Sequence, residues 1–281
     1  MKRITRAQMV IVLKNKPPAY LTHYTTVSGL IGILQHDSLW ASNVSFLNDR
    51  RELMHGLDAT RQVLEDYSKE HPDLSLSFAK EVIADLAKSK LPDIYAACFC
   101  RKDDLLSQWR GYGGKEQGVS ITFRGPQLEE LFKKRHGTMM EVIYDKERTA
   151  ARAKNALNKA LDNFDDILGP TAKKDKKAKL ASAISRLVPR FKDDGFAEEN
   201  EWRFVIQRTN DLRDVQFRER DGVIVPYLVV SADVGDNLPI QHITVGPGKK
   251  QDVTIRSIEI LLKAKGYSDV SVRPSSVPYR T

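Results

Sequence analysis

The sequence predicts an α+β fold, with a mainly β core and helices inserted between its strands. Short apolar or alternating runs recur along the chain, which is typical of strands, while longer stretches repeat apolar residues at helical spacing. The 281 residues are 41% hydrophobic and 29% charged, as in ordinary soluble globular proteins. No internal repeat or low-complexity linker divides the chain, so we expect a single domain over residues 1–281.

The first elements are a short strand and an apolar helix, both within residues 20–34. Thr26 or Ser28 is suited to cap this helix, because a hydroxyl at its start accepts from backbone N–H groups that the first turn leaves without partners. His23 lies on the strand, close to the helix start, where it is placed to meet a polar ligand. A buried imidazole bonded to a backbone carbonyl is the simpler explanation of a lone histidine, and both interpretations stay open here.

The other strands are predicted from apolar or alternating runs, and the helices from apolar residues three or four positions apart. Asn48 and Asp49 predict a turn, since both residue types hydrogen-bond their own backbone. The expected strands cover residues 37–42, 94–100, 119–123, 140–144, 202–206, 223–230, 240–245 and 269–272. The expected helices contain Leu53, Leu57, Leu64 and Tyr67, then Phe78, Val82 and Leu86, and finally residues 255–265.

A basic helical insertion is predicted at about 146–195. Residues 148–192 carry two apolar stripes at helical spacing, separated by Gly169 and Pro170, so we interpret them as a helical hairpin. From 146 to 192, thirteen Lys or Arg stand against five Asp or Glu, which equals the net charge of +8 of the whole chain. Such a local excess indicates either a footprint for nucleic acid or another polyanion, or a solvated helical face.

A glycine-rich loop follows the strand at 94–100. Its glycines, four of them from 111 to 118, permit close backbone approach to a ligand, but their spacing matches neither a P-loop nor a dinucleotide fingerprint. Trp109 and Tyr112 offer flat faces for a base or a nicotinamide ring. A glycine-rich hairpin with two core aromatics is the alternative.

Acidic residues crowd the start of the apolar strand at 202–206. Ionised carboxylates rarely face a core without partners. Alternation puts Glu199, Glu201 and Arg203 on one face, provided that the strand already runs through position 199. An internal Glu–Arg pair and a catalytic carboxylate are both consistent with this pattern.

Cysteine content and hydropathy bear on the cellular setting. Two cysteines, Cys98 and Cys100, are too few for a disulfide or zinc framework, which favours a reducing environment. No segment approaches membrane-spanning length, and the short apolar run near the N-terminus lacks a small-residue cleavage site. We therefore expect a cytoplasmic protein with no membrane partner and no bound metal.

Five motifs make the chain resemble the uncharacterised bacterial family DUF2971, nearly from end to end. The family name carries no activity. The motifs are Leu-Thr-His-Tyr-Thr (21–25), Phe-Leu-Asn-Asp-Arg-Arg-Glu (46–52), Cys-Phe-Cys (98–100) with Gln-Trp-Arg-Gly-Tyr (108–112), Glu-Asn-Glu-Trp-Arg (199–203) and Ser-Val-Pro-Tyr-Arg (276–280).

The first elements are also distantly similar to those of ADP-ribosyltransferases. A histidine on the first strand precedes a helix that ends Gly-Ile-Leu (32–34) and a strand Leu-Trp-Ala-Ser (39–42). The resemblance implies a split, mixed β-sheet core with a His-Tyr-Glu set on three strands. In such a set the histidine binds a ribose hydroxyl of NAD, the tyrosine stacks on nicotinamide, and the glutamate bonds the 2′-hydroxyl of the nicotinamide ribose.

Carried onto this sequence, the resemblance gives His23 the first position and Glu201 the third. The middle position falls to Tyr112, with Trp109 and Tyr24 as alternatives. NAD is then the implied cofactor, consumed as a substrate. The residues expected to contact it, besides Glu201, are His23, Tyr24, Thr25, Asn48, Asp49, Trp109, Tyr112 and Arg203.

The first functional hypothesis is therefore an NAD-dependent ADP-ribosyltransferase, or an NAD glycohydrolase with water as acceptor. A carboxylate against the 2′-hydroxyl stabilises the positive charge that develops on the ribose, and nicotinamide leaves without a metal or a strong acid. Glu199, as a second catalytic residue, would bind or deprotonate the acceptor. The basic insertion suggests a nucleic-acid acceptor, with a protein second. The resemblance also implies a role as a toxin or in phage defence.

Two alternatives belong to other classes. The first is a non-catalytic nucleotide or nucleic-acid binding module, which the same basic insertion favours. The second is a metal nuclease built from Asp49, Glu52, Glu199 and Glu201. Four acidic residues are easily found by chance in a chain with 37, so the nuclease is the weaker hypothesis.

Overall fold

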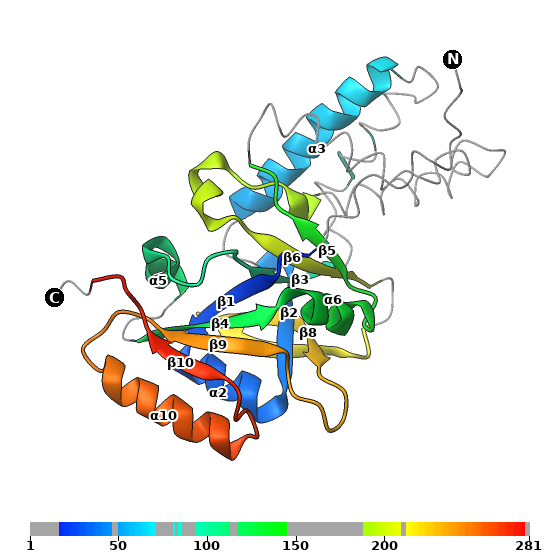
Figure 1. Cartoon of the computed structure of the whole chain (residues 1–281). Coiled ribbons are helices and arrows are strands. Elements are labelled where there is room, and N and C mark those ends of the chain that lie inside the picture. Colours follow the sequence, from blue (N-terminus) through cyan, green and yellow to red (C-terminus); the bar gives the residue numbers. More distant parts are fainter. Residues whose placement is uncertain are drawn as a thin grey trace, which may run out of the picture.

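A computed structural model of the chain has two β-sheets with helices packed around them, so the predicted α+β class is confirmed (Figure 1). Most of the basic insertion predicted at about 146–195 lies outside the described residues, as do Asn48, Asp49 and the helical stripe of Phe78, Val82 and Leu86. The structure describes residues 17–46, 50–70, 81, 84–85, 94–112, 117–144, 188–208 and 212–278.

The first sheet has four strands, in the order β1 (Tyr20–Thr26), β4 (Gly118–Arg124), β9 (Ile240–Val245) and β10 (Ser271–Pro274). β4 lies antiparallel to β1 and β9, whereas β10 runs parallel to β9, so this sheet is mixed. The strand that contains His23 is therefore an edge strand, paired along its whole length with β4.

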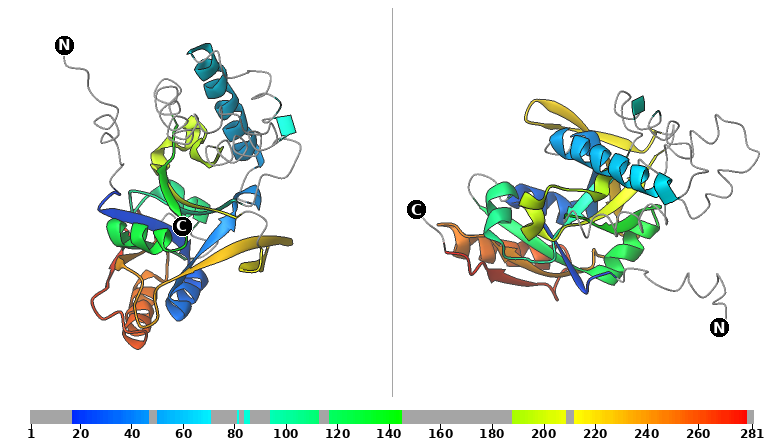
Figure 2. Two further views of the ribbon diagram at one scale, coloured as in Figure 1. Left: turned by 90° about the vertical axis from the view of Figure 1, so that its right-hand side faces the viewer. Right: turned by 90° about the horizontal axis from the view of Figure 1, so that it is seen from above.

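The second sheet has six strands, and each neighbouring pair is antiparallel. Register places Cys98 opposite Arg203, and Phe99 opposite Trp202. The hairpin of its last two strands lies at the periphery of the molecule (Figure 2). The strand order is β5 (Thr138–Glu141), β6 (Trp202–Gln207), β3 (Ile94–Phe99), β2 (Ser38–Asn43), β8 (Val223–Ser231) and β7 (Val215–Arg220).

The two sheets meet where β1 passes the end of β3. Thr22 and Cys100 exchange two backbone hydrogen bonds, of 2.8 and 2.7 Å, in an isolated antiparallel bridge. This link brings the histidine of β1 beside the end of β3, so that His23 Nδ1 lies 3.0 Å from the carbonyl oxygen of Cys98. The junction between the sheets is thus where residues of both sheets can share a site.

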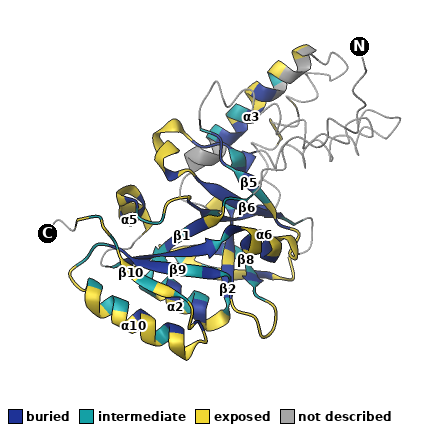
Figure 3. Ribbon diagram, in the orientation of Figure 1, coloured by how far each residue is buried: buried dark blue, intermediate teal, exposed yellow. Residues whose placement is uncertain are grey.

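Helices pack on both sheets. α2 (Val27–His36) and α10 (Gln251–Ala264) lie on one side of the first sheet, and α3 (Arg50–Glu70) projects away from both sheets (Figures 1 and 2). α10 buries Ile258 and Leu262 and leaves its outer face exposed (Figure 3). The described residues also include α5 (Leu106–Tyr112), α6 (Gly125–Lys133) and the 3₁₀ turns η1 (Val44–Phe46), η2 (Val188–Arg190) and η3 (Asp194–Glu199).

The start of α2 has the cap that its sequence predicts. Thr26 has an extended backbone, and its Oγ1 accepts a hydrogen bond of 3.1 Å from the Gly29 backbone N–H. Ser28, the other candidate, instead bonds the Thr26 hydroxyl at 2.9 Å. A Cβ at position 29 would lie 2.2 Å from Thr25 Oγ1, so the glycine lets the helix begin close against the end of β1.

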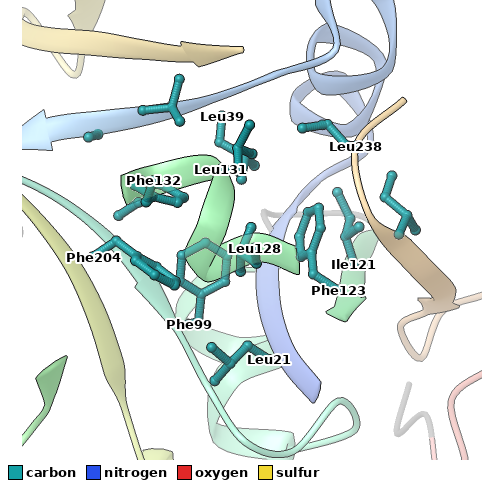
Figure 4. Close-up of a cluster of buried hydrophobic side chains, with 14 of the residues drawn as sticks. Leu21, Leu39, Phe99, Ile121, Phe123, Leu128, Leu131, Phe132, Phe204 and Leu238 are labelled. Atoms are coloured by element: carbon teal, nitrogen blue, oxygen red, sulfur yellow. The ribbon is translucent and has the colours of Figure 1, made fainter. Parts of the chain in front are cut away.

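The largest hydrophobic cluster joins the two sheets through aromatic side chains (Figure 4). Phe99 of β3 lies at its centre, with ring centroids 5.9, 6.2 and 5.5 Å from those of Phe123, Phe132 and Phe204. The Phe132 ring of α6 stacks on the Phe204 ring of β6 at 4.2 Å. Full burial of each such side chain contributes about 1.5–3 kcal/mol. This packing links β3 and β6 of the second sheet to β4 of the first.

The glycine-rich loop predicted after β3 begins instead as the helix α5. Leu105 and Trp109 are four residues apart, and the Trp109 backbone N–H donates to the Leu105 carbonyl at 3.0 Å. Both side chains belong to a small buried cluster with Tyr24. This apolar spacing outweighs Gly111, because a helical glycine costs only about 1 kcal/mol relative to alanine.

Some predicted boundaries were wrong. The strand expected at 140–144 is β5, which already ends at Glu141. The helix expected to reach 192 does not include residues 188–190, which form the short turn η2, since Pro189 lacks the N–H that an α-helix needs. The strand expected at 202–206 is β6 and is confirmed, but it does not extend back to 199, because η3 ends in a left-handed Asn200 (φ 45°).

Two described elements, α6 and β7, were not predicted. β7 has the sequence Val-Gln-Phe-Arg-Glu-Arg, and its Phe217 is exposed. An edge strand needs no alternating apolar pattern, and charged residues are common on such strands because they discourage pairing with other chains. Within the part of the chain that is described, no helix has the length and apolar character to cross a membrane.

Candidate functional site

A cavity of about 640 Å³ lies at the junction of the two sheets, within the size range of small-molecule sites. Its lining comes from β1, the start of α2, β2, β3, the end of α5, the start of β6 and the end of β7. Six residues that the sequence nominated line it together, namely His23, Tyr24, Thr25, Tyr112, Glu201 and Arg203.

The His23 imidazole is held in one tautomer. Its Nδ1 lies 3.0 Å from the Cys98 carbonyl oxygen, which can only accept, so Nδ1 carries the proton and Nε2 keeps a lone pair. Burial lowers the pKa of His23; the bond to Cys98 opposes this effect and the charge of Arg218 adds to it. The ring is therefore neutral at pH 7. Its Nε2 can accept a hydrogen bond, and His23 lines the cavity. The sequence had allowed either a histidine bonded to a backbone carbonyl or one placed to meet a ligand. His23 both bonds a carbonyl and lines the cavity.

The three aromatic candidates for the middle position differ in their burial and in whether they line the cavity. Trp109 is buried behind the cavity wall, edge-on to the Tyr24 ring at a centroid distance of 4.8 Å, and its Nε1 donates to Asp104 at 2.8 Å. Tyr112 is 39% exposed and lines the cavity. Burial raises the pKa of Tyr112, so its hydroxyl stays protonated at neutral pH. Of the two aromatics on α5, Tyr112 is the one that can meet a ligand.

The C-terminal motif holds α5 in place. The Asp104 carboxylate, just before the helix, accepts from the backbone N–H and the hydroxyl of Ser276, both at 2.7 Å. The same carboxylate accepts from the Ser275 hydroxyl and from Trp109 Nε1. These bonds join two motifs that lie far apart in the sequence, and they fix the helix that ends at Tyr112.

Glu201 lies in a buried network of charges. Its Oε1 accepts from Arg203 Nε at 2.6 Å, and its Oε2 accepts from Arg203 Nη2 at 3.0 Å and from Lys192 Nζ at 2.8 Å. Lys192 also donates to Glu199 Oε2 at 2.5 Å. Burial alone would raise the pKa of Glu201, but the charges of Arg203 and Lys192 outweigh it and lower that pKa to about 2. Glu201 is therefore ionised, and the internal Glu–Arg pair that the sequence allowed is present.

Glu199 would share a face with Glu201 if the strand ran through 199, but Glu199 is the last residue of η3. Lys192 bridges the carboxylates of Glu199 and Glu201, and Glu199 is not among the residues that line the cavity. The catalytic role expected for Glu199 therefore has no direct geometric support. The sequence also missed Lys192, which lines the cavity and is only 5% exposed.

Two further lining residues that the sequence did not nominate, Arg218 and Arg220, belong to the unpredicted strand β7. The only signal was their spacing of two, which places them on one face if the segment is a strand.

Asn48 and Asp49 lie outside the described residues, so two of the expected NAD contacts have no place in this geometry. The acids of the nuclease hypothesis are described only at Glu199 and Glu201, whose carboxylates bind Lys192 instead.

The ionised state of Glu201 predicts a pH dependence of stability. Because its pKa falls from 4.5 to about 2 on folding, Glu201 stabilises the native state above pH 4.5, and this contribution is lost as the pH falls toward 2. The loss amounts to about 3 kcal/mol. Urea unfolding at pH 6, 4 and 3 should therefore show a steeper decline for the wild type than for Glu201→Gln. Parallel declines in the two proteins would contradict the network.

The comparisons with known proteins find a family match for part of the chain. Residues 108–204 match the family DUF2971, described as a protein of unknown function. The predicted family is therefore supported over this segment alone, about a third of the chain, which contains Tyr112, Lys192 and Glu201. The motifs at 21–25, 46–52 and 276–280 lie outside the match. No curated protein and no solved structure matches the chain. The comparisons therefore name no activity and give no support for an ADP-ribosyltransferase resemblance.

Proposed function

We propose that this chain binds NAD in the cavity and cleaves the bond between nicotinamide and ribose, as an ADP-ribosyltransferase or an NAD glycohydrolase on a core of that type. The observation that carries the proposal is that His23, Tyr112 and Glu201, from three distant segments, line one cavity. They occur along the chain in the order histidine, tyrosine, glutamate.

Each residue has a part that its chemistry suits. His23 Nε2 accepts a hydrogen bond from a ribose hydroxyl, and the Tyr112 ring packs on nicotinamide. The bond from C1′ to the nicotinamide nitrogen breaks, and its electron pair leaves with nicotinamide, which becomes neutral. The Glu201 carboxylate stabilises the positive charge left on the ribose. An acceptor oxygen or nitrogen then bonds C1′ and loses its proton to solvent or to a nearby base.

The acceptor belongs to the same proposal. The basic stretch between residues 146 and 192 favours a nucleic acid, and a protein is the alternative. Such a transfer would suit a toxin or a phage-defence protein. The first test is incubation with NAD, with and without RNA, DNA or a cell extract, while nicotinamide release is followed by chromatography. Absence of release under every condition would overturn the proposal.

The His23 imidazole provides a sharper test. His23→Phe keeps a ring in place but removes Nε2, so NAD binding should weaken about tenfold, the typical value of one hydrogen bond in a buried site. His23→Gln should recover part of the loss. His36→Phe, at the exposed C-terminal end of α2, is the matched control and should bind like the wild type. Calorimetric titration measures all four proteins, and equal affinities would exclude His23 from the binding site.

A non-catalytic nucleotide-binding protein is the second candidate, and one observation favours it. Both Glu201 oxygens already accept hydrogen bonds from Arg203, and Oε2 accepts a further one from Lys192. A carboxylate so engaged has less capacity to bond a ribose hydroxyl. This candidate predicts NAD binding with no nicotinamide release. A nucleic-acid ligand would be recognised by an affinity that falls steeply with salt.

A further inference from the structure

Among the described residues, the two arginines of β7 have no acidic partner within ion-pair distance. Arg218 and Arg220 lie two residues apart on the strand, and both line the cavity. Arg218 Nη2 donates to the Ser42 hydroxyl at 2.9 Å, and Arg220 Nη2 donates to the Phe46 carbonyl at 2.7 Å. Within the described segments, neither arginine forms an ion pair with a carboxylate. Their charges are therefore not neutralised by a carboxylate among the described residues.

Arg218 is held in an unfavourable environment for a cation. Its Nε is buried and has no hydrogen-bond partner among the described residues. The guanidinium lies over the Trp40 and Tyr227 rings, at 5.1 and 5.8 Å from their centroids, which fixes its orientation. Burial and the charge of Arg220 both lower the pKa of Arg218. An anion between the two guanidinium groups would offset the burial of Arg218 and the repulsion by Arg220.

The start of α2 adds to the positive potential in the cavity. Thr26, Ser28 and Gly29, at the N-terminus of the ten-residue helix α2, also line it. A helix N-terminus carries partial positive charge and favours phosphate. Among the described residues, two carboxylates line the cavity. Glu201 is paired with Arg203 and Lys192, and Glu219 accepts a hydrogen bond from the Gly222 backbone N–H.

We propose that Arg218 and Arg220 form a subsite for the diphosphate group of a nucleotide ligand. Guanidinium groups bind phosphate oxygens through paired N–H donors, which suits a diphosphate better than a single carboxylate. The inference deepens the proposed function, and rests on it only in naming NAD as the source of the diphosphate. The charge of Arg218 acts on the His23 imidazole, so the subsite adjoins the ribose-binding group.

The test is calorimetric binding of inorganic pyrophosphate, ADP-ribose and nicotinamide riboside to the full chain. Arg218→Gln and Arg220→Gln should each weaken pyrophosphate and ADP-ribose binding tenfold or more, as expected for charge-assisted hydrogen bonds. Nicotinamide riboside, which has no phosphate, should bind all variants alike. Arg256→Gln makes the same charge change on the exposed face of α10 and should bind every probe like the wild type. Circular dichroism confirms that each variant is folded.

The outcomes separate this inference from the proposed function. If both arginine variants lose ADP-ribose binding and the wild type releases no nicotinamide, the subsite is supported and the proposed reaction is overturned. NAD turnover with an unchanged KM in both variants overturns the subsite and leaves the reaction standing. Arginine-dependent binding of a single-stranded oligonucleotide, with no binding of pyrophosphate or ADP-ribose, overturns the subsite in favour of a nucleic-acid surface.

Discussion

Glu201→Gln is expected to lower NAD turnover by a factor on the order of 10²–10³, the usual effect of removing one group that stabilises a developing charge. Glutamine has nearly the same shape and keeps an oxygen that can accept from Arg203. The negative charge, however, is lost. Because the charge acts mainly on the transition state, kcat should fall much more than the affinity for NAD. Nicotinamide release at saturating NAD measures this effect.

Two further variants keep the Glu201 experiment interpretable. Glu198→Gln removes a carboxylate from an exposed position in the same 3₁₀ turn as Glu199 and should leave turnover unchanged. Glu201→Asp retains the charge beside Lys192 and Arg203, so it should remain folded even if the glutamine variant does not, yet its shorter side chain should still slow the reaction. Full activity in folded Glu201→Gln would remove this residue from the mechanism.

Lys192→Met is expected to reduce the free energy of unfolding by about 3–5 kcal/mol, the cost of breaking a buried ion pair by removing one partner. Lys192 is 5% exposed and donates to both Glu199 and Glu201, at 2.5 and 2.8 Å. Without it, Glu201 keeps Arg203, whereas Glu199 loses its bond to the ammonium group. Chemical denaturation at pH 7 measures the loss, with Lys263→Met on the exposed face of α10 as the control.

A double variant tests the physical reason for that loss. If the destabilisation comes from loss of the ammonium partner of the buried Glu199 carboxylate, then adding Glu199→Gln to Lys192→Met should restore part of the stability. The double variant should therefore be more stable than Lys192→Met alone, with a coupling energy well above the few tenths of a kcal/mol typical of independent sites. Additive effects would show that the lysine contributes through packing alone.

The elements predicted correctly are those whose signals are local. Thr26 caps α2 through a bond to a backbone N–H three residues away, and the strands at 240–245 and 223–231 carry apolar runs of their own. β7 and α5 depend on their surroundings instead. The charged strand β7 pairs with β8 at the edge of the second sheet, and α5 is stabilised by packing of Trp109 on Tyr24, 85 positions earlier in the chain.

The residues of the site also differ in how far the sequence alone could predict them. His23, Tyr112 and Glu201 stand out in the sequence because each is a polar or aromatic residue at the boundary of an apolar element. Lys192 and Arg218 give no comparable signal. Basic residues are common in this chain, with 45 Lys or Arg in total, and it is burial against Glu199 or position over Trp40 that gives these two their place in the site.

The sequence by itself determined the α+β class, the strand and helix around His23, the DUF2971 family over residues 108–204 and six of the residues that line the cavity. Only the tertiary structure decided which of those residues meet, and in what state. The bridge between Thr22 and Cys100 brings β1 against β3, and with it His23 against the Cys98 carbonyl. Burial beside Lys192 and Arg203 then keeps Glu201 ionised. Local patterns encode periodicity and caps, whereas desolvation and charge pairing depend on residues that the chain brings together only when it folds.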